Sequence, residues 1–150
     1  NLSIARKASH VTSGLKPPHC AVREPEMNIT ASHRPLSVLV VEDESLVAMN
    51  LESILVDLGH AVIGPISSLS ELDTALEAGL KADVAILDIN IAGEQIYAHA
   101  RRLQALGIPL LFASGYGESG ISDDFSGHPM VPKPYTEIDI AGGLSAIRAA

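Results

Sequence analysis

Four short apolar runs in the chain each end in a polar side chain that can do chemistry. The runs and the residues that follow them are 38–41 with Glu42 and Asp43, 84–87 with Asp88, 109–113 with Ser114, and 130–132 with Lys133. A short continuous apolar run is typical of a strand that is buried on both faces of a parallel sheet. Because parallel strands end at a common edge, we expect the acids, the hydroxyl and the amine to meet at that edge.

The acids in this set favour a cation site. Glu42, Asp43 and Asp88 would repel one another at one sheet edge unless a positive charge neutralises them. Oxygen ligands without His or Cys suit a hard ion, and Mg²⁺ prefers a few carboxylates together with water. A solvated acidic edge without metal is the simpler alternative.

Lys133 and Ser114 extend the pattern to phosphate chemistry. Lys133 precedes Pro134, whose ring favours an extended conformation at the preceding residue, so the ammonium can reach back over the sheet edge. An ammonium beside carboxylates also fits a plain structural ion pair. With a hydroxyl present, the set fits a phosphoryl group better: the cations neutralise its oxygens, the hydroxyl donates a hydrogen bond, and one carboxylate attacks phosphorus.

The elements that must position these residues alternate between strands and helices. We expect strands at 37–41, 61–66, 84–88, 108–113 and 129–131, and a helical stripe between successive strands. The stripes run from Leu46 to Leu58, from an N-cap at Ser70 to Gly79, from Ile96 to Leu106, and from Ile138 to Ile147; residues 115–127 offer only a short possible helix. This alternation predicts an α/β fold with a doubly wound parallel sheet.

Composition narrows the class of protein. Of the 150 residues, the segment after residue 35 holds sixteen acidic and five basic residues, a net charge of −11 that disfavours nucleic acid as a partner. No apolar stretch approaches the length of a membrane span. Cys20 is the single cysteine, which fits a reducing, cytoplasmic location. Residues 1–34 lack a sustained period and are expected to form a flexible flank before a domain at 35–150.

The motifs around these residues resemble the receiver domain of two-component response regulators. The resemblance covers about residues 36–150 and rests on Val-Leu-Val-Val-Glu-Asp-Glu, Ile-Leu-Asp-Ile-Asn, Phe-Ala-Ser-Gly and Val-Pro-Lys-Pro-Tyr in this order. It implies a flavodoxin-like fold with five strands in the order 2-1-3-4-5. The run Phe-Ala-Ser-Gly-Tyr is also similar to a variant receiver group of alphaproteobacteria that carries Phe-Ala-Thr-Gly-Tyr.

The resemblance implies a role for each residue of the pattern. Asp88 would be the phosphoacceptor, with Ser114 and Lys133 assisting. Mg²⁺ would be held by Glu42, Asp43, Asp88 and the backbone carbonyl of Asn90. The switch residues would be Ser114, Gly115, Tyr116 and Tyr135, and the Lys133–Pro134 bond would be cis. Met130 stands where ordinary receivers carry a switch aromatic, and Ile91-Ala92 replaces a usual Met-Pro pair.

The function implied is a phosphorylation switch rather than an enzyme with an external substrate. A sensor histidine kinase or a histidine phosphotransfer protein would phosphorylate Asp88, the domain would catalyse at most its own phosphotransfer and dephosphorylation, and an unknown protein would receive the signal without a DNA-binding domain. Two alternatives stay open. One is a Mg²⁺-dependent aspartyl phosphatase, although Asn90 stands where its second acid would be. The other is a phosphate-independent scaffold.

Overall fold

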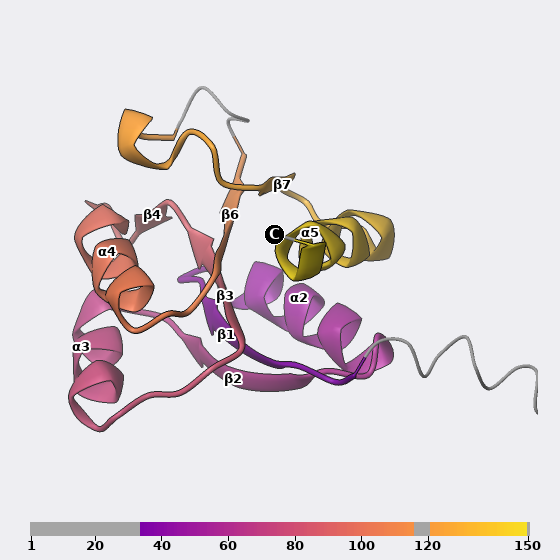
Figure 1. The fold of residues 1–150 in the computed structure, drawn as a ribbon, viewed down its shortest axis with the longest axis horizontal. Coiled ribbons are helices and arrows are strands. Elements are labelled where there is room, and N and C mark those ends of the chain that lie inside the picture. The colour runs from indigo at the N-terminus through magenta and orange to yellow at the C-terminus, as the bar shows by residue number, and fades with distance from the viewer. Residues whose placement is uncertain (1–33, 116–120, 150) are drawn as a thin grey trace, which may run out of the picture. The chain divides into compact units, whose positions relative to one another are not determined.

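A five-stranded parallel sheet with helices on both faces organises the domain (Figure 1). The computed structural model describes residues 34–115 and 121–149. The strands are β1 (Ser37–Val41), β2 (Ala61–Ile66), β3 (Val84–Asp88), β6 (Leu110–Ser114) and β7 (Met130–Pro132), in the spatial order β2-β1-β3-β6-β7. This is the expected order 2-1-3-4-5, so the expected fold class is confirmed. The expected flank at 1–34 lies outside the described residues, except for Arg34.

Each face of the sheet is covered by two helices. Helices α2 (Ser45–Asp57) and α5 (Glu137–Ala149) cover one face, and α3 (Leu69–Glu77) and α4 (Tyr97–Ala105) cover the other (Figure 1). Successive residues of β1 alternate between the two cores: Val38 and Val40 pack with α2 and α5, whereas Leu39 and Val41 pack with α3 and α4. Because both faces are buried, the central strands read as continuous apolar runs. None of the described helices is long and apolar enough to cross a membrane.

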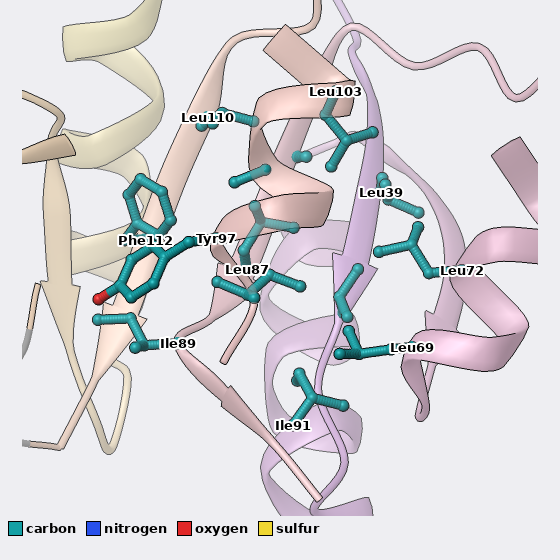
Figure 2. Packing of buried hydrophobic residues seen from close by; sticks show 14 of the residues in the cluster. Leu39, Leu69, Leu72, Leu87, Ile89, Ile91, Tyr97, Leu103, Leu110 and Phe112 are labelled. Atoms are coloured by element: carbon teal, nitrogen blue, oxygen red, sulfur yellow. The ribbon is translucent and has the colours of Figure 1, made fainter. Parts of the chain in front are cut away.

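The core on the α3 and α4 side contains a group of aromatic rings, of which Figure 2 labels Tyr97 and Phe112. Tyr97 of α4 stacks on Phe125 with ring centroids 5.7 Å apart, and Phe112 of β6 meets Phe125 edge-on at 5.3 Å. Phe125 belongs to the 3-10 helix η4 (Asp123–Phe125) and is 1% exposed. A single buried aromatic side chain thus attaches the short helix between β6 and β7 to the core.

Two local expectations about helix and strand ends are wrong. Helix α3 is capped by Ser68 rather than Ser70, because the Ser68 hydroxyl accepts the amide proton of Glu71, a capping-box spacing. Strand β6 starts at Leu110 rather than residue 108. The Ile108 amide donates instead to the carbonyl oxygen of Leu103 at the end of α4, and Pro109 has no amide proton for the ladder.

Helical spacing also assigned some exposed side chains to the core. Leu46 at the start of α2 is 81% exposed and Ile138 at the start of α5 is 83% exposed. Leu106, expected in the apolar stripe of α4, follows the helix and is 57% exposed. These three residues lie at helix ends, where the apolar stripe has already turned away from the sheet.

A small hairpin after β3 was not expected from the sequence. Strands β4 (Asn90–Ile91) and β5 (Glu94–Gln95) pair antiparallel and are joined by Ala92 and Gly93, whose φ angles are +52° and +88°. Two positive φ angles in a two-residue loop are the type I′ pattern, which usually carries Asn-Gly. The chain thus forms a hairpin at the place where Ile91-Ala92 replaces the usual Met-Pro pair.

Helix α5 approaches the sheet closely at one glycine. A Cβ atom on Gly143 would lie 2.9 Å and 3.0 Å from the two terminal carbons of Leu111 and 3.1 Å from a methyl of Val131. Leu111 is fully buried, so its side chain has little room to move aside. A Cβ atom on the neighbouring Gly142 would meet nothing within 4 Å.

Alanine substitutions at these adjacent glycines are expected to act in opposite directions. Gly142→Ala should stabilise the domain by about 0.5–1 kcal/mol, because alanine loses less backbone entropy in a helix. Gly143→Ala should destabilise it by about 1–2 kcal/mol, because overpacking against Leu111 outweighs that gain. Urea unfolding followed by circular dichroism gives both free energies, and a change of the same sign in both variants would contradict the close approach of α5.

Candidate functional site

The acid pair, Glu42 and Asp43, is held in place at the end of β1. The Glu42 amide donates to the carbonyl oxygen of Ile66 at 2.9 Å, which keeps the chain beside the end of β2. In β2, Gly64 has φ +104° and precedes Pro65 through a cis bond, and a Cβ atom on Gly64 would lie 3.0 Å from the Val40 carbonyl oxygen. Glycine is therefore required where β2 passes closest to β1.

Two carboxylates share one ammonium at this edge of the sheet. Lys133 Nζ lies 3.0 Å from Glu42 Oε1 and 3.0 Å from Asp88 Oδ2. Glu42 is 1% exposed and Asp88 is 8% exposed, so all three groups interact away from bulk water. The Lys133–Pro134 bond is cis, as expected, and the Lys133 amide donates to the Ser114 carbonyl oxygen at 3.2 Å. The expectation that Lys133 reaches back over the edge is confirmed.

Burial and charge shift the proton affinities of these groups. Burial raises the pKa of Glu42 to about 7, although hydrogen bonds from the Glu44 amide and from Lys133 act in the opposite direction. Burial alone would lower the pKa of Lys133, but its hydrogen bonds to Asp88 and Glu42 outweigh that effect and raise it. Lys133 is therefore charged at neutral pH and does not readily give up a proton.

Three acids form a cluster that could bind a metal ion. Ligand oxygens of Glu42, Asp43 and Asp88 all lie within 4.8 Å of one another. Asp43 Oδ2 also accepts the amide proton of Ala92 at 2.9 Å, which ties the hairpin turn to the acid pair. A donor set made only of oxygens fits a hard divalent cation, and one lysine does not balance three carboxylates.

The strand ends surround one open cavity of about 740 Å³. Its described lining includes the expected residues Asp43, Asp88, Asn90, Ser114, Gly115 and Lys133. The backbone nitrogen of Asn90 lies 3.4 Å from Asp88 Oδ1 and donates a weak hydrogen bond to it. Ser114, at the end of β6, is 3% exposed, and its neighbour Ala113 pairs with Asp88 in the ladder. An anion the size of a phosphoryl group can thus enter beside Asp88 and meet both an ammonium and a hydroxyl-bearing residue.

Of the two tyrosines expected as switch residues, Tyr135 lies within the described residues. Tyr135 is 6% exposed and packs in the core on the α2 and α5 side, where its carbonyl oxygen accepts from Asn50 at 3.5 Å. Burial, reinforced by the nearby Glu42 and Asp88 carboxylates, raises the pKa of Tyr135. Its hydroxyl is therefore neutral at physiological pH. Tyr116 lies outside the described residues.

Two polar residues that line the cavity, Glu44 and Gln95, received no role from the sequence. Glu44 directly follows Glu42 and Asp43 in the sequence, and its carboxylate lies 3.6 Å from Lys133 Nζ. The run of three consecutive acids was therefore a signal in the sequence that Glu44 lies at the site. Gln95 reaches the cavity only because the hairpin turns back beside β3. Its signal was the Ala92-Gly93 turn, in which only one residue has typical hairpin chemistry.

Comparison with known proteins gives one curated relative. No protein-family model matches the chain. The phyllosphere-induced regulator PhyR of Methylorubrum extorquens is 25% identical over 118 residues, which make up 77% of this chain and 44% of the relative. The chain therefore spans less than half of the length of that protein.

Two solved structures match over nearly their whole length. SdrG from Sphingomonas melonis Fr1 is 34% identical, with 76% of this chain and 97% of SdrG covered and a TM-score of 0.68. The REC domain of the PhyR response regulator from Erythrobacter litoralis is 28% identical, with 77% and 91% covered and a TM-score of 0.66. With this identity to SdrG, a shared sheet order and the acids and lysine together at one sheet edge, the chain belongs to the receiver domains of response regulators.

Proposed function

We propose that this receiver domain is a phosphoacceptor switch in which Asp88 takes a phosphoryl group from a histidine kinase or a histidine phosphotransfer protein. The observation that carries the proposal is the ion pair of Lys133 with Asp88, 3.0 Å long, on a cavity that is open beside an acid pair. We assign the receiver to residues 35–150 and treat residues 1–34 as a flank. A cytoplasmic location fits such donors.

The transfer uses groups that are already in place. A carboxylate oxygen of Asp88 attacks the phosphorus of the phosphohistidine, the phosphorus–nitrogen bond breaks, and the imidazole leaves with a proton from solvent. Lys133 Nζ, already hydrogen-bonded to Asp88 Oδ2, remains close enough to pair with the incoming phosphoryl oxygens. The reaction is self-catalysed, and we propose no external substrate.

We infer that Mg²⁺ completes the site. Glu42, Asp43 and Asp88 would supply carboxylate oxygens, and Asn90 would supply its backbone carbonyl. When bound, the ion neutralises the acids and the phosphoryl oxygens. Without the ion, Glu42 and Asp88 share the ammonium of Lys133, and Asp43 accepts one amide proton.

The output proposed is a change in the segment that follows β6. Phosphorylation would draw Ser114 toward Asp88 and move Gly115 and Tyr116, with Tyr135 responding from the neighbouring core. An output protein then binds the altered face. We propose protein partners rather than nucleic acid, because residues 36–150 carry a net charge of −11.

Asp88 is expected to be the sole phosphorylated residue. Treatment with phosphoramidate and Mg²⁺ should add one phosphoryl group to the intact mass, because Lys133 hydrogen-bonds to Glu42 and Asp88, and of these two acids Asp88 lines the cavity. Asp88→Asn should take up none, whereas Asp57→Asn, a control at an exposed helical aspartate, should be labelled normally. Equal labelling of Asp88→Asn would contradict the assignment.

Labelling is expected to depend on a divalent cation. Mg²⁺ or Mn²⁺ should be required, because an anionic donor otherwise meets uncompensated carboxylates. Asp43→Asn should be labelled at least about tenfold more slowly, since it keeps the side-chain shape but loses a ligand charge. The control Glu77→Gln, at an exposed glutamate of α3 outside the three-acid cluster, should be labelled at the normal rate. Undiminished labelling in excess chelator would rule out the metal site.

The segment 115–127 is expected to change its hydrogen-exchange protection when beryllofluoride, a phosphoryl mimic, binds. Residues 116–120 lie outside the described residues. The second half of the segment is anchored to the core, because Phe125 is buried and the Ser122 amide donates to the Tyr97 hydroxyl at 2.9 Å. We therefore expect the largest change in peptides that contain residues 115–121. Changes elsewhere, with none in 115–127, would refute the switch.

A further inference from the structure

The hairpin β4–β5 brings an amide side chain to the candidate site that the proposed function does not use. Asn90 and Gln95 stand directly opposite each other in the antiparallel ladder. Residues paired in this way project from the same face of the ladder. Both line the cavity that contains Asp88 and Lys133, so the Gln95 amide belongs to the same space as the phosphoacceptor.

The side-chain amides of Asn90 and Gln95 differ in their hydrogen bonds. Asn90 Oδ1 accepts the amide proton of Gly93 at 2.9 Å, so this side chain fixes the hairpin turn. Gln95 is exposed, and its side chain makes no hydrogen bond with the described residues. Of the two neutral side-chain amides on the described cavity wall, that of Gln95 therefore has both its oxygen and its nitrogen without a hydrogen-bond partner among the described residues, whereas the oxygen of Asn90 is already engaged.

The position of Asp88 sets the direction from which water can reach a phosphoryl group. Asp88 is 8% exposed, and Lys133 occupies one of its oxygens. A phosphoryl group on Asp88 must therefore project into the cavity, and a water molecule in line with the bond to Asp88 must come from the open side. Glu44 also lines this cavity, but its negative charge would repel the phosphoryl oxygens.

We propose that Gln95 is the positioning residue for hydrolysis of the phosphoryl group on Asp88 and so sets the lifetime of the phosphorylated state. The inference rests on the proposed function. The amide oxygen accepts a hydrogen bond from the attacking water, and the amide nitrogen donates to a phosphoryl oxygen. Glutamine orients the attacking water in other phosphoryl-transfer proteins.

The step balances with water as the co-reactant. The water oxygen forms a bond to phosphorus while the bond between phosphorus and the Asp88 carboxylate oxygen breaks. Asp88 leaves as a carboxylate, and inorganic phosphate is released with one proton passing to solvent. No oxidant or external base is needed, because an acyl phosphate has a good leaving group.

The test separates loading from decay in the full chain. The unmodified protein, Gln95→Ala, Gln95→Glu and the control Glu94→Ala are phosphorylated with phosphoramidate and Mg²⁺, the donor is removed, and loss of the phosphoryl group is followed by intact-mass spectrometry. Glu94 is the neighbouring residue on β5 and pairs with Ile91 on the other face of the hairpin. We expect both Gln95 variants to lose phosphate about tenfold more slowly, the equivalent of one lost hydrogen bond in the transition state. Loading rates, and the decay of Glu94→Ala, should be unchanged.

Each other outcome has a definite meaning. Equal or faster decay in Gln95→Ala overturns the inference, as does normal decay in Gln95→Glu, because that variant keeps the size but loses the amide donor. Loading and decay that slow together in the Gln95 variants assign a structural role to the hairpin and also overturn it. Absence of any labelling in the unmodified protein overturns the proposed function itself.

Discussion

The ammonium of Lys133 between two buried carboxylates is the interaction on which the site depends. Glu42 and Asp88 end neighbouring strands, and without a cation between them their charges would push the edge of the sheet apart. Removing one partner of such a group leaves an unpaired buried charge, which is far more costly than the pair itself. Burial at this edge also raises the pKa of Glu42 to about 7, although the hydrogen bond from Lys133 acts in the opposite direction.

The strands of the main sheet were predictable from sequence because they share one repeated pattern, whereas the small hairpin after β3 has no such pattern. The strands ending at Glu42, Asp88, Ser114 and Lys133 are apolar runs with a polar end, so both the fold and the meeting of these residues could be inferred. The hairpin at Asn90–Gln95 could not, because two-residue strands have no periodicity and Ala92 lacks the usual turn chemistry. Gln95 was missed for that reason alone.

The two ends of the crossover between β6 and β7 differ: the first borders the cavity, and the second is anchored in the core. Ser114 and Gly115 open onto the cavity, whereas Phe125 is packed between Tyr97 and Phe112, and Asp124 pairs with Arg101 at 2.7 Å. A buried aromatic contact is worth far more than a surface ion pair, so the ring is the main anchor. Under the proposed function, this anchor would confine rearrangement to the part of the crossover nearest Asp88.

The two outer strands, β2 and β7, have a consequence for how this domain meets other molecules. An edge strand normally exposes unpaired amide and carbonyl groups that can recruit a strand from another chain. Here β2 contains Pro65 and β7 ends at Pro132, and proline offers no amide hydrogen to an added strand. Each outer strand therefore contains a residue that cannot donate to an added strand, which disfavours growth of the sheet at either side. Contacts through the helices and loops of the domain do not meet this obstacle.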